Sequence, residues 1–116
     1  MYIWHCDAIG KYSAVSSEGT SGQRWLRASQ PIDSEGNVTF KTIIPGWYQG
    51  RILHYHIRIH LDDDSANTWE VTTQVFIENS VKNDILNDGV YSSNKNTLIE
   101  YSSDNIYTSL PTDLRD

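Results

Sequence analysis

Two histidines separated by one residue, His54 and His56, follow Tyr48 and Arg51 in the stretch PGWYQGRILHYH (45–56). Successive side chains of a β-strand point to opposite faces, so in a strand both imidazoles share one face and can reach a single metal ion. Histidines at this spacing also occur as ordinary surface or hydrogen-bonded pairs. The surrounding residues have to decide between these interpretations.

Three kinds of metal site that contain such a pair fit the neighbouring residues poorly. A structural zinc site needs cysteines, and Cys6 is the single cysteine of the chain. A 2-His-1-carboxylate iron(II) site needs Asp or Glu at the next alternate position, where Arg58 stands. A cupin-type site needs a downstream glutamate, where the chain has His60 and the acidic run 62–64.

Tyr48 favours a different ion. The pKa of a tyrosine is near 10, so a phenolate is a poor ligand for soft or divalent ions at neutral pH (about 7). A hard, highly charged cation such as iron(III) lowers the pKa of its own ligands. Two histidines with tyrosine oxygens would therefore give a mixed nitrogen and oxygen site that favours iron(III).

The elements that must position these residues are mostly strands. Alternating runs predict strands at 2–6, 24–32, 38–45, 51–61 and 68–77, with turns at Gly10 and at 33–37. One short helix is expected around 79–86, and the chain from Tyr91 onward is polar and irregular. The pattern predicts a mostly β fold with an antiparallel β-sandwich core.

The strand at 51–61 is expected to have one chemical face and one core face. Alternation places His54, His56, Arg58 and His60 on the chemical face. The core face is expected to consist of four residues: Tyr55, Ile57, Ile59 and Leu61.

Length and charge restrict the function. The 116 residues fit one domain, 1–116, and the net charge of −6 with nine Lys and Arg argues against a nucleic-acid backbone as partner. Apolar runs are too short to span a membrane, and one cysteine allows no internal disulfide. The residues from Met1 to His5 already read as the interior of a strand, so we expect an N-terminally truncated domain with an exposed strand edge.

Three separated stretches resemble the intradiol ring-cleavage dioxygenases, the non-haem iron(III) enzymes that open catechols. They are WHCDAIGKYS (4–13), LRASQPIDSEGNVTFKTIIPGWYQGRILHYHIRIH (26–60) and VTTQVFI (71–77), in the family's order. The chain looks most like the single-domain, often secreted branch, in which Trp-His-Cys-Asp-Ala and Pro-Gly-Trp-Tyr recur. The resemblance extends to about Tyr107.

The resemblance implies a site. In that family two tyrosines and two histidines hold iron(III), and the matching residues are Tyr12, Tyr48, His54 and His56. Arg51 matches an arginine that acts on the bound substrate, and Gln74 matches a glutamine that faces the site. His5, Cys6 and His60 are not expected to be ligands. Four tryptophans are expected in the core or the pocket wall: Trp4, Trp25, Trp47 and Trp69.

The resemblance also implies an activity. A catechol-type diol and O2 would be the substrates, and the ring would open between the two hydroxyl-bearing carbons to a muconate-type diacid. Tyr48 is expected to leave the metal and take up a substrate proton, while Arg51 stabilises charge that develops on the ring. An extracellular location and a monomer are expected. The alternative is a non-catalytic or truncated β-sandwich relative that has lost iron binding.

Overall fold

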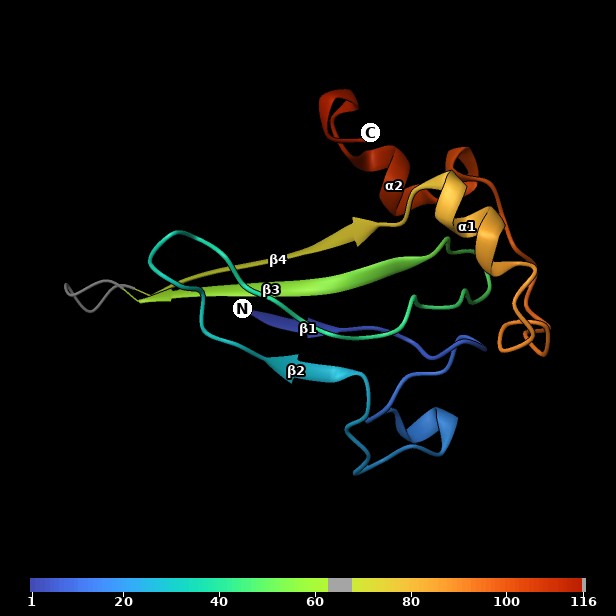
Figure 1. Ribbon diagram of the computed structural model, residues 1–116, viewed down its shortest axis with the longest axis horizontal. Coiled ribbons are helices and arrows are strands. Elements are labelled where there is room, and N and C mark those ends of the chain that lie inside the picture. The colour runs from blue at the N-terminus through green and yellow to red at the C-terminus, as the bar shows by residue number, and fades with distance from the viewer. Residues whose placement is uncertain (63–67, 116) are drawn as a thin grey trace.

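A computed structural model describes residues 1–62 and 68–115 and contains one four-stranded antiparallel sheet (Figure 1). The strand order is β2-β1-β3-β4. The bounds are Tyr2–Trp4 for β1, Arg27–Ser29 for β2, His54–Asp62 for β3 and Thr68–Phe76 for β4. The mostly β, antiparallel fold predicted from the sequence is confirmed.

The two long strands form a hairpin that carries the chemical residues. β3 pairs with β4 from His54↔Phe76 to Asp62↔Thr68, close to the ranges predicted from the alternation. β3 starts at His54 and not at 51, because Arg51 closes a turn with Tyr48. Thus the first strand residue is already a candidate ligand.

The strand predicted at 38–45 does not form. Pairing with a neighbouring strand would use its backbone groups, but tyrosine side chains take two of its carbonyls. The carbonyl of Ile43 accepts a hydrogen bond from the Tyr55 hydroxyl at 3.1 Å, and that of Ile44 accepts one from Tyr91 at 2.7 Å. Sequence alternation alone could not distinguish this packed extended segment from a strand.

The core lies beside the start of β3 and the end of β4. Its buried residues come from five parts of the chain and are Ala8, Trp47, Leu53, Ile77, Ile85 and Tyr91. The predicted short helix is confirmed as α1, Asn79–Ile85, and it lies next to the end of β4 (Figure 1). The core therefore packs against the end of the hairpin that carries His54, where the candidate site lies.

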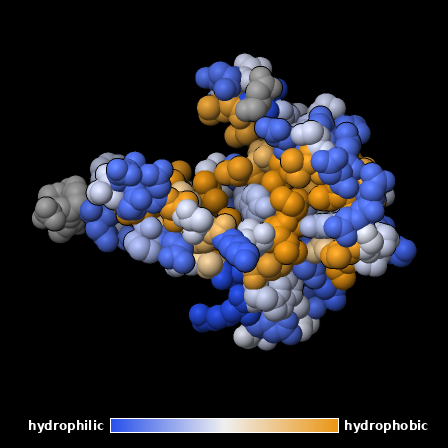
Figure 2. Space-filling view, viewed as in Figure 1, coloured by the Kyte–Doolittle hydropathy of each residue, from blue (hydrophilic) through white to orange (hydrophobic). Residues whose placement is uncertain are grey.

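The prediction that one face of β3 is buried along its whole length is wrong near Leu61, at the end far from the core. Tyr55 packs against the core, but Leu61 is 53% exposed and its partner Trp69 on β4 is 64% exposed. The cross-strand neighbours Val71 and Val75 are exposed as well. The buried core ends near Tyr55, and beyond it Ile57 and Ile59 are half-buried, so this part of the hairpin is only partly covered. Hydrophobic surface is also visible across the middle of the molecule in Figure 2.

The segment predicted to be a polar, irregular tail contains short helices. They are the 3₁₀ turn η2 (Tyr101–Ser103), the helix α2 (Asn105–Ser109) and the 3₁₀ turn η3 (Thr112–Leu114); a further 3₁₀ turn, η1, spans Ser16–Glu18. The Tyr107 ring of α2 packs edge-on against Phe76, with centroids 5.2 Å apart. None of the described helices is both long and apolar enough to cross a membrane.

Candidate active site

A tight turn places Tyr48 and Arg51 beside the first histidine. The Arg51 N–H donates to the Tyr48 carbonyl at 3.1 Å, and Gly50 within the turn has φ +79°, which favours glycine. After Ile52 and Leu53, both fully buried, β3 begins with His54. The turn therefore brings a phenol, a guanidinium and an imidazole to one end of the sheet.

Four side chains with metal-binding atoms converge at this place. The Tyr48 hydroxyl lies 3.2 Å from His54 Nε2, and His54 Nε2 lies 3.2 Å from His56 Nε2. His56 Nε2 in turn lies 3.0 Å from the Tyr12 hydroxyl. The structure thus brings together the four residues that the resemblance predicts as ligands. Their role as ligands stays a prediction.

Neighbouring groups orient both imidazoles. His54 Nδ1 lies 2.6 Å from the Ile52 carbonyl, which can only accept a hydrogen bond. Nδ1 therefore carries the proton, and Nε2 of the neutral ring keeps the lone pair that a metal ion needs. Trp4 pairs with His56 across the sheet, and its ring stacks on the imidazole at 4.9 Å with an interplanar angle of 8°.

The Tyr12 phenol is held by the loop that follows the first strand. The backbone N–H of Tyr12 donates to the Glu18 carboxylate at 2.6 Å, and its carbonyl accepts from the Thr20 hydroxyl at 2.6 Å. The ring of Tyr12 packs edge-on against that of Tyr48 at 5.6 Å. Two loops far apart in the sequence thus deliver the two phenols.

Burial controls the protonation of these groups. It lowers the pKa of His54 and of His56 to about 4, so both imidazoles are neutral near pH 7. Burial, with a further contribution from Tyr48, raises the pKa of Tyr12, so this phenol ionises only with help from a cation.

This donor set fits a ferric ion. Two neutral imidazole nitrogens and two phenol oxygens form the mixed nitrogen and oxygen site that a hard cation prefers. Within residues 1–62 and 68–115, no three His, Cys, Asp or Glu side chains come together as an alternative cluster. The lone pair of His54 Nε2, which faces the Tyr48 hydroxyl and His56 Nε2, is the observation that supports this fit most directly.

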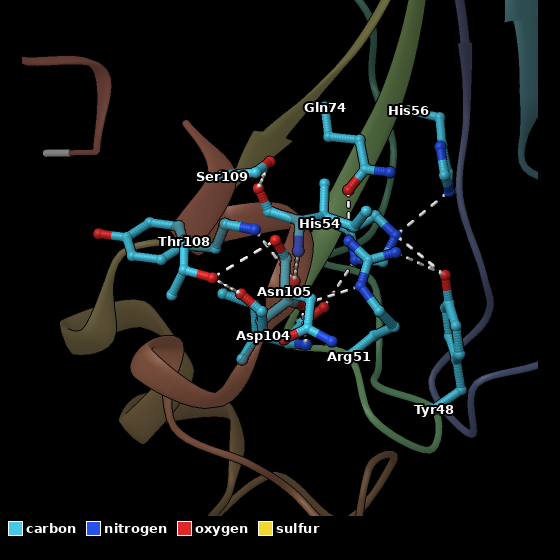
Figure 3. Close-up of polar contacts among 12 residues, drawn as sticks. Tyr48, Arg51, His54, His56, Gln74, Asp104, Asn105, Thr108 and Ser109 are labelled. Atoms are coloured by element: carbon cyan, nitrogen blue, oxygen red, sulfur yellow. Dashed lines mark hydrogen bonds and ion pairs between the residues drawn. The ribbon is translucent and has the colours of Figure 1, made fainter. Parts of the chain in front are cut away.

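Arg51 lies against this group and makes contacts on three sides (Figure 3). Its Nη1 donates to the Tyr48 hydroxyl at 3.3 Å, and its Nη2 donates to the Gln74 side-chain carbonyl. Its Nε donates to Asp104 at 2.9 Å. The predicted arginine and glutamine are therefore adjacent to the four candidate ligands.

A cavity of about 210 Å³ lies beside His56. His56 and Gln74 line one side, and Ile106 and Leu110 from the C-terminal segment line another. A small aromatic ring fits a space of this size. The segment expected to be irregular therefore contributes to the site, through both this wall and Asp104.

Other sequence predictions can be compared with the structure. His5 and Cys6 are both buried, and His5 hydrogen-bonds to Thr42 at 2.7 Å, as expected for packing residues. His60 pairs with Asp62 at 3.1 Å on the exposed part of β3. Trp47 is in the core, whereas the expectation for Trp69 is wrong, because the core does not extend along the hairpin.

Sequence reasoning missed Asp104. Asp104 is the N-cap of a short helix, and aspartate is common at that position. An N-cap predicts no contact with Arg51, which lies 53 positions earlier in the sequence. That link follows only from the fold.

Comparison with solved structures identifies the fold. An intradiol ring-cleavage dioxygenase from Tetranychus urticae matches with a TM-score of 0.82 and 29% identity over 94% of this chain. The resemblance to the intradiol ring-cleavage dioxygenases is confirmed. The crystal structure of a second dioxygenase matches with a TM-score of 0.79 and 29% identity over 92% of this chain. No protein-family model and no curated protein matches the sequence.

The match covers part of each dioxygenase. The chain spans 56% of the length of the first and 55% of the second, about half of each.

Proposed function

We propose that the chain is a non-haem iron(III) dioxygenase that cleaves catechol-type rings between the two hydroxyl-bearing carbons. The observation that carries this proposal is the convergence of two phenols and two neutral imidazoles. Their donor atoms follow one another from Tyr48 through His54 and His56 to Tyr12, at successive distances of 3.2, 3.2 and 3.0 Å. The resemblance to intradiol dioxygenases gives independent support. Both atoms of O2 would enter the product, a muconate-type diacid.

Tyr12, Tyr48, His54 and His56 would hold the iron. A bound ferric ion would supply Lewis acidity that makes the ring of the diol reactive toward O2. The rigid strand β3 carries both imidazoles, so they stay in place during the reaction.

Tyr48 is suited to move a proton. Its hydroxyl lies on the turn before β3 and is 3.3 Å from Arg51 Nη1, so a cation lies beside the phenolate when it forms. The Tyr48 phenolate would be the proton acceptor for the incoming diol. Tyr48 would therefore act both as a ligand and as the general base.

Arg51 would stabilise negative charge on the ring. Its guanidinium is directed into the site by three neighbours and is always charged. A fixed cation stabilises charge that develops in the transition state more than charge in the resting complex. Gln74 would accept a hydrogen bond from this guanidinium and form part of the cavity wall.

One experiment tests the proposal. The purified chain is reconstituted with ferric iron, its visible spectrum is recorded, and catechol is added under ¹⁸O2. We expect a red-brown charge-transfer band from tyrosinate, a change of that band with catechol, and a diacid that carries two ¹⁸O atoms. A colourless reconstituted protein would contradict the proposal.

The second candidate is a non-catalytic relative that has lost iron binding. The exposed Leu61, Trp69 and Val71 of the hairpin favour it, because such a surface is unusual on an isolated domain. It predicts no iron by elemental analysis and self-association in solution. An iron-loaded monomer with a sharp unfolding transition would exclude it.

The compartment and the oligomeric state belong to the same proposal. Resemblance to the often secreted branch supports an extracellular location, and a monomer is the simplest state for a single domain. Secretion into the medium by cells that express the protein tests the first point, and its mass in solution tests the second.

A further inference from the structure

The carboxylate of Asp104 accepts four hydrogen bonds from a fully buried position. Its Oδ1 accepts from the backbone N–H groups of Ile106 and Tyr107 at 2.9 and 3.0 Å, and so caps α2. Its Oδ2 accepts from Arg51 Nε and from the Ile52 backbone N–H, both at 2.9 Å. The side chain is 0% exposed. One carboxylate therefore joins the C-terminal helix to the residues just before β3.

The charge of this carboxylate is matched by its surroundings. Burial would raise the pKa of Asp104, but hydrogen bonds from Ile52 and Tyr107 and the Arg51 guanidinium outweigh it and lower the pKa. A buried carboxylate that stays ionised needs such partners. The contact with Arg51 is thus a charge-assisted hydrogen bond in a dry environment.

Asp104 determines which nitrogens of Arg51 remain for the site. With Nε held by Asp104, the planar guanidinium directs Nη1 at the Tyr48 hydroxyl and Nη2 at the Gln74 side chain (Figure 3). The flexible stem of an arginine allows other directions when Nε is free. The orientation of the cation beside the four donors therefore depends on a residue of the C-terminal segment.

We propose that Asp104 is a positioning residue that holds the Arg51 guanidinium for ring cleavage and makes turnover depend on the docking of α2. This inference rests on the proposed function. It separates two roles of one side chain, because Oδ1 serves the helix and Oδ2 serves the arginine.

Asp104→Asn tests the role of Oδ2. An asparagine can keep one oxygen for the amides of α2, but its NH2 group then faces the two donors of Arg51 and Ile52. We expect kcat to fall about 10- to 100-fold, as is typical when a supporting hydrogen-bond partner is removed, with a smaller change in KM. The same substitution at Asp33, an exposed turn aspartate that accepts from Glu35 N and Asn37 N, is the matched control and should change kcat less than about twofold.

A double-mutant cycle tests whether Asp104 acts through Arg51. Arg51→Ala removes the cation, and adding Asp104→Asn to it should cause little further loss of kcat. Losses that multiply would overturn the proposal. Thr108→Val removes a hydrogen bond within α2 to the Asp104 carbonyl without touching Arg51, so it should lower the unfolding temperature. At temperatures where α2 is still docked, it should leave kcat unchanged.

A readout that needs no turnover separates this inference from the proposed function. In nuclear magnetic resonance spectra of the full chain without added metal, the Arg51 Nε–H should exchange with solvent at least about tenfold faster in Asp104→Asn than in the wild type. Equal exchange rates would overturn the proposal even in an active enzyme. A slow, Asp104-dependent exchange in a chain without ring-cleavage activity would support the positioning contact and reject only the proposed function.

Arg51→Lys keeps the test decisive where Asp104→Asn does not fold. Lysine retains the charge but has one ammonium group, which cannot contact Asp104, Tyr48 and Gln74 in the arrangement of the guanidinium. We expect kcat to fall at least about tenfold. Wild-type kcat in Arg51→Lys would overturn the proposal.

Discussion

The Nε2 atoms of His54 and His56 lie 3.2 Å apart on β3, and Trp4 of the neighbouring strand stacks on the His56 ring. Alternation along β3 explains the first contact, since His54 and His56 are two positions apart on one face. The strand register explains the second, since His56 stands opposite Trp4 on one side and Gln74 on the other. The nitrogen donors are therefore built into the sheet, whereas the phenols of Tyr12 and Tyr48 come from loops. This division predicts different consequences for the two kinds of donor.

Removal of either histidine should abolish iron binding. His54→Ala or His56→Ala takes away a neutral donor that the sheet holds in place, and neither loop can replace it. After reconstitution, the iron content measured by elemental analysis should be less than about one tenth of that of the wild type. His60→Ala is the matched control on the same strand, because His60 lies outside the group and pairs with Asp62. Iron loss in His60→Ala with iron retained in His54→Ala would disprove the ligand assignment.

Removal of the Tyr48 hydroxyl should affect substrate binding more than iron binding. Tyr48→Phe keeps the ring but removes the proton acceptor, so some iron should remain while catechol binds at least about tenfold more slowly. Stopped-flow absorbance without oxygen measures this rate. Tyr55→Phe removes a hydroxyl on the opposite face of β3, where it donates to the Ile43 carbonyl, and should leave the rate unchanged. Unaltered catechol binding in Tyr48→Phe would show that the proton goes elsewhere.

The sequence predicts more of the candidate site than of the fold around it. The alternation of β3 placed His54 and His56 on one face, and the family motifs pointed to Tyr12, Tyr48 and Gln74, which the structure brings close to them. Such local rules depend on neighbours in sequence.

The parts of the structure that the sequence analysis predicted wrongly or missed depend on long-range packing. Whether the extended residues 38–45 pair as a strand depends on where Tyr55 and Tyr91 place their hydroxyls. Whether Leu61 is buried depends on what lies over the hairpin. The link from Asp104 to Arg51 joins positions that no sequence period relates.

The glycine of the Pro-Gly-Trp-Tyr motif, Gly46, is predicted to be important for stability. A Cβ at Gly46 would collide with the backbone carbonyl of Ala8, which sits on the loop leading to Tyr12. Because the obstruction is backbone, Gly46→Ala should lower the free energy of unfolding by about 1–3 kcal/mol or more. Urea denaturation measures this loss. Gly89→Ala, where nothing lies within 4 Å, should change it by less than about 0.5 kcal/mol. Equal stability of the two variants would show that the two loops are not packed in this way.

Three imidazoles should make the metal-free chain unstable in mild acid. Burial lowers the pKa of His5, His54 and His56, in the last two from 6.5 to about 4. Between pH 6.5 and about 4 the unfolded chain therefore binds protons that the folded chain does not, so the free energy of unfolding falls as the pH is lowered through this window. Each such proton contributes a slope of at most about 1.4 kcal/mol per pH unit. Urea unfolding at several pH values measures the slope. His5→Gln removes one of the three groups without touching the four candidate ligands, and should make the slope shallower. A free energy of unfolding that stays constant or rises as the pH falls through this window would contradict the burial of these rings.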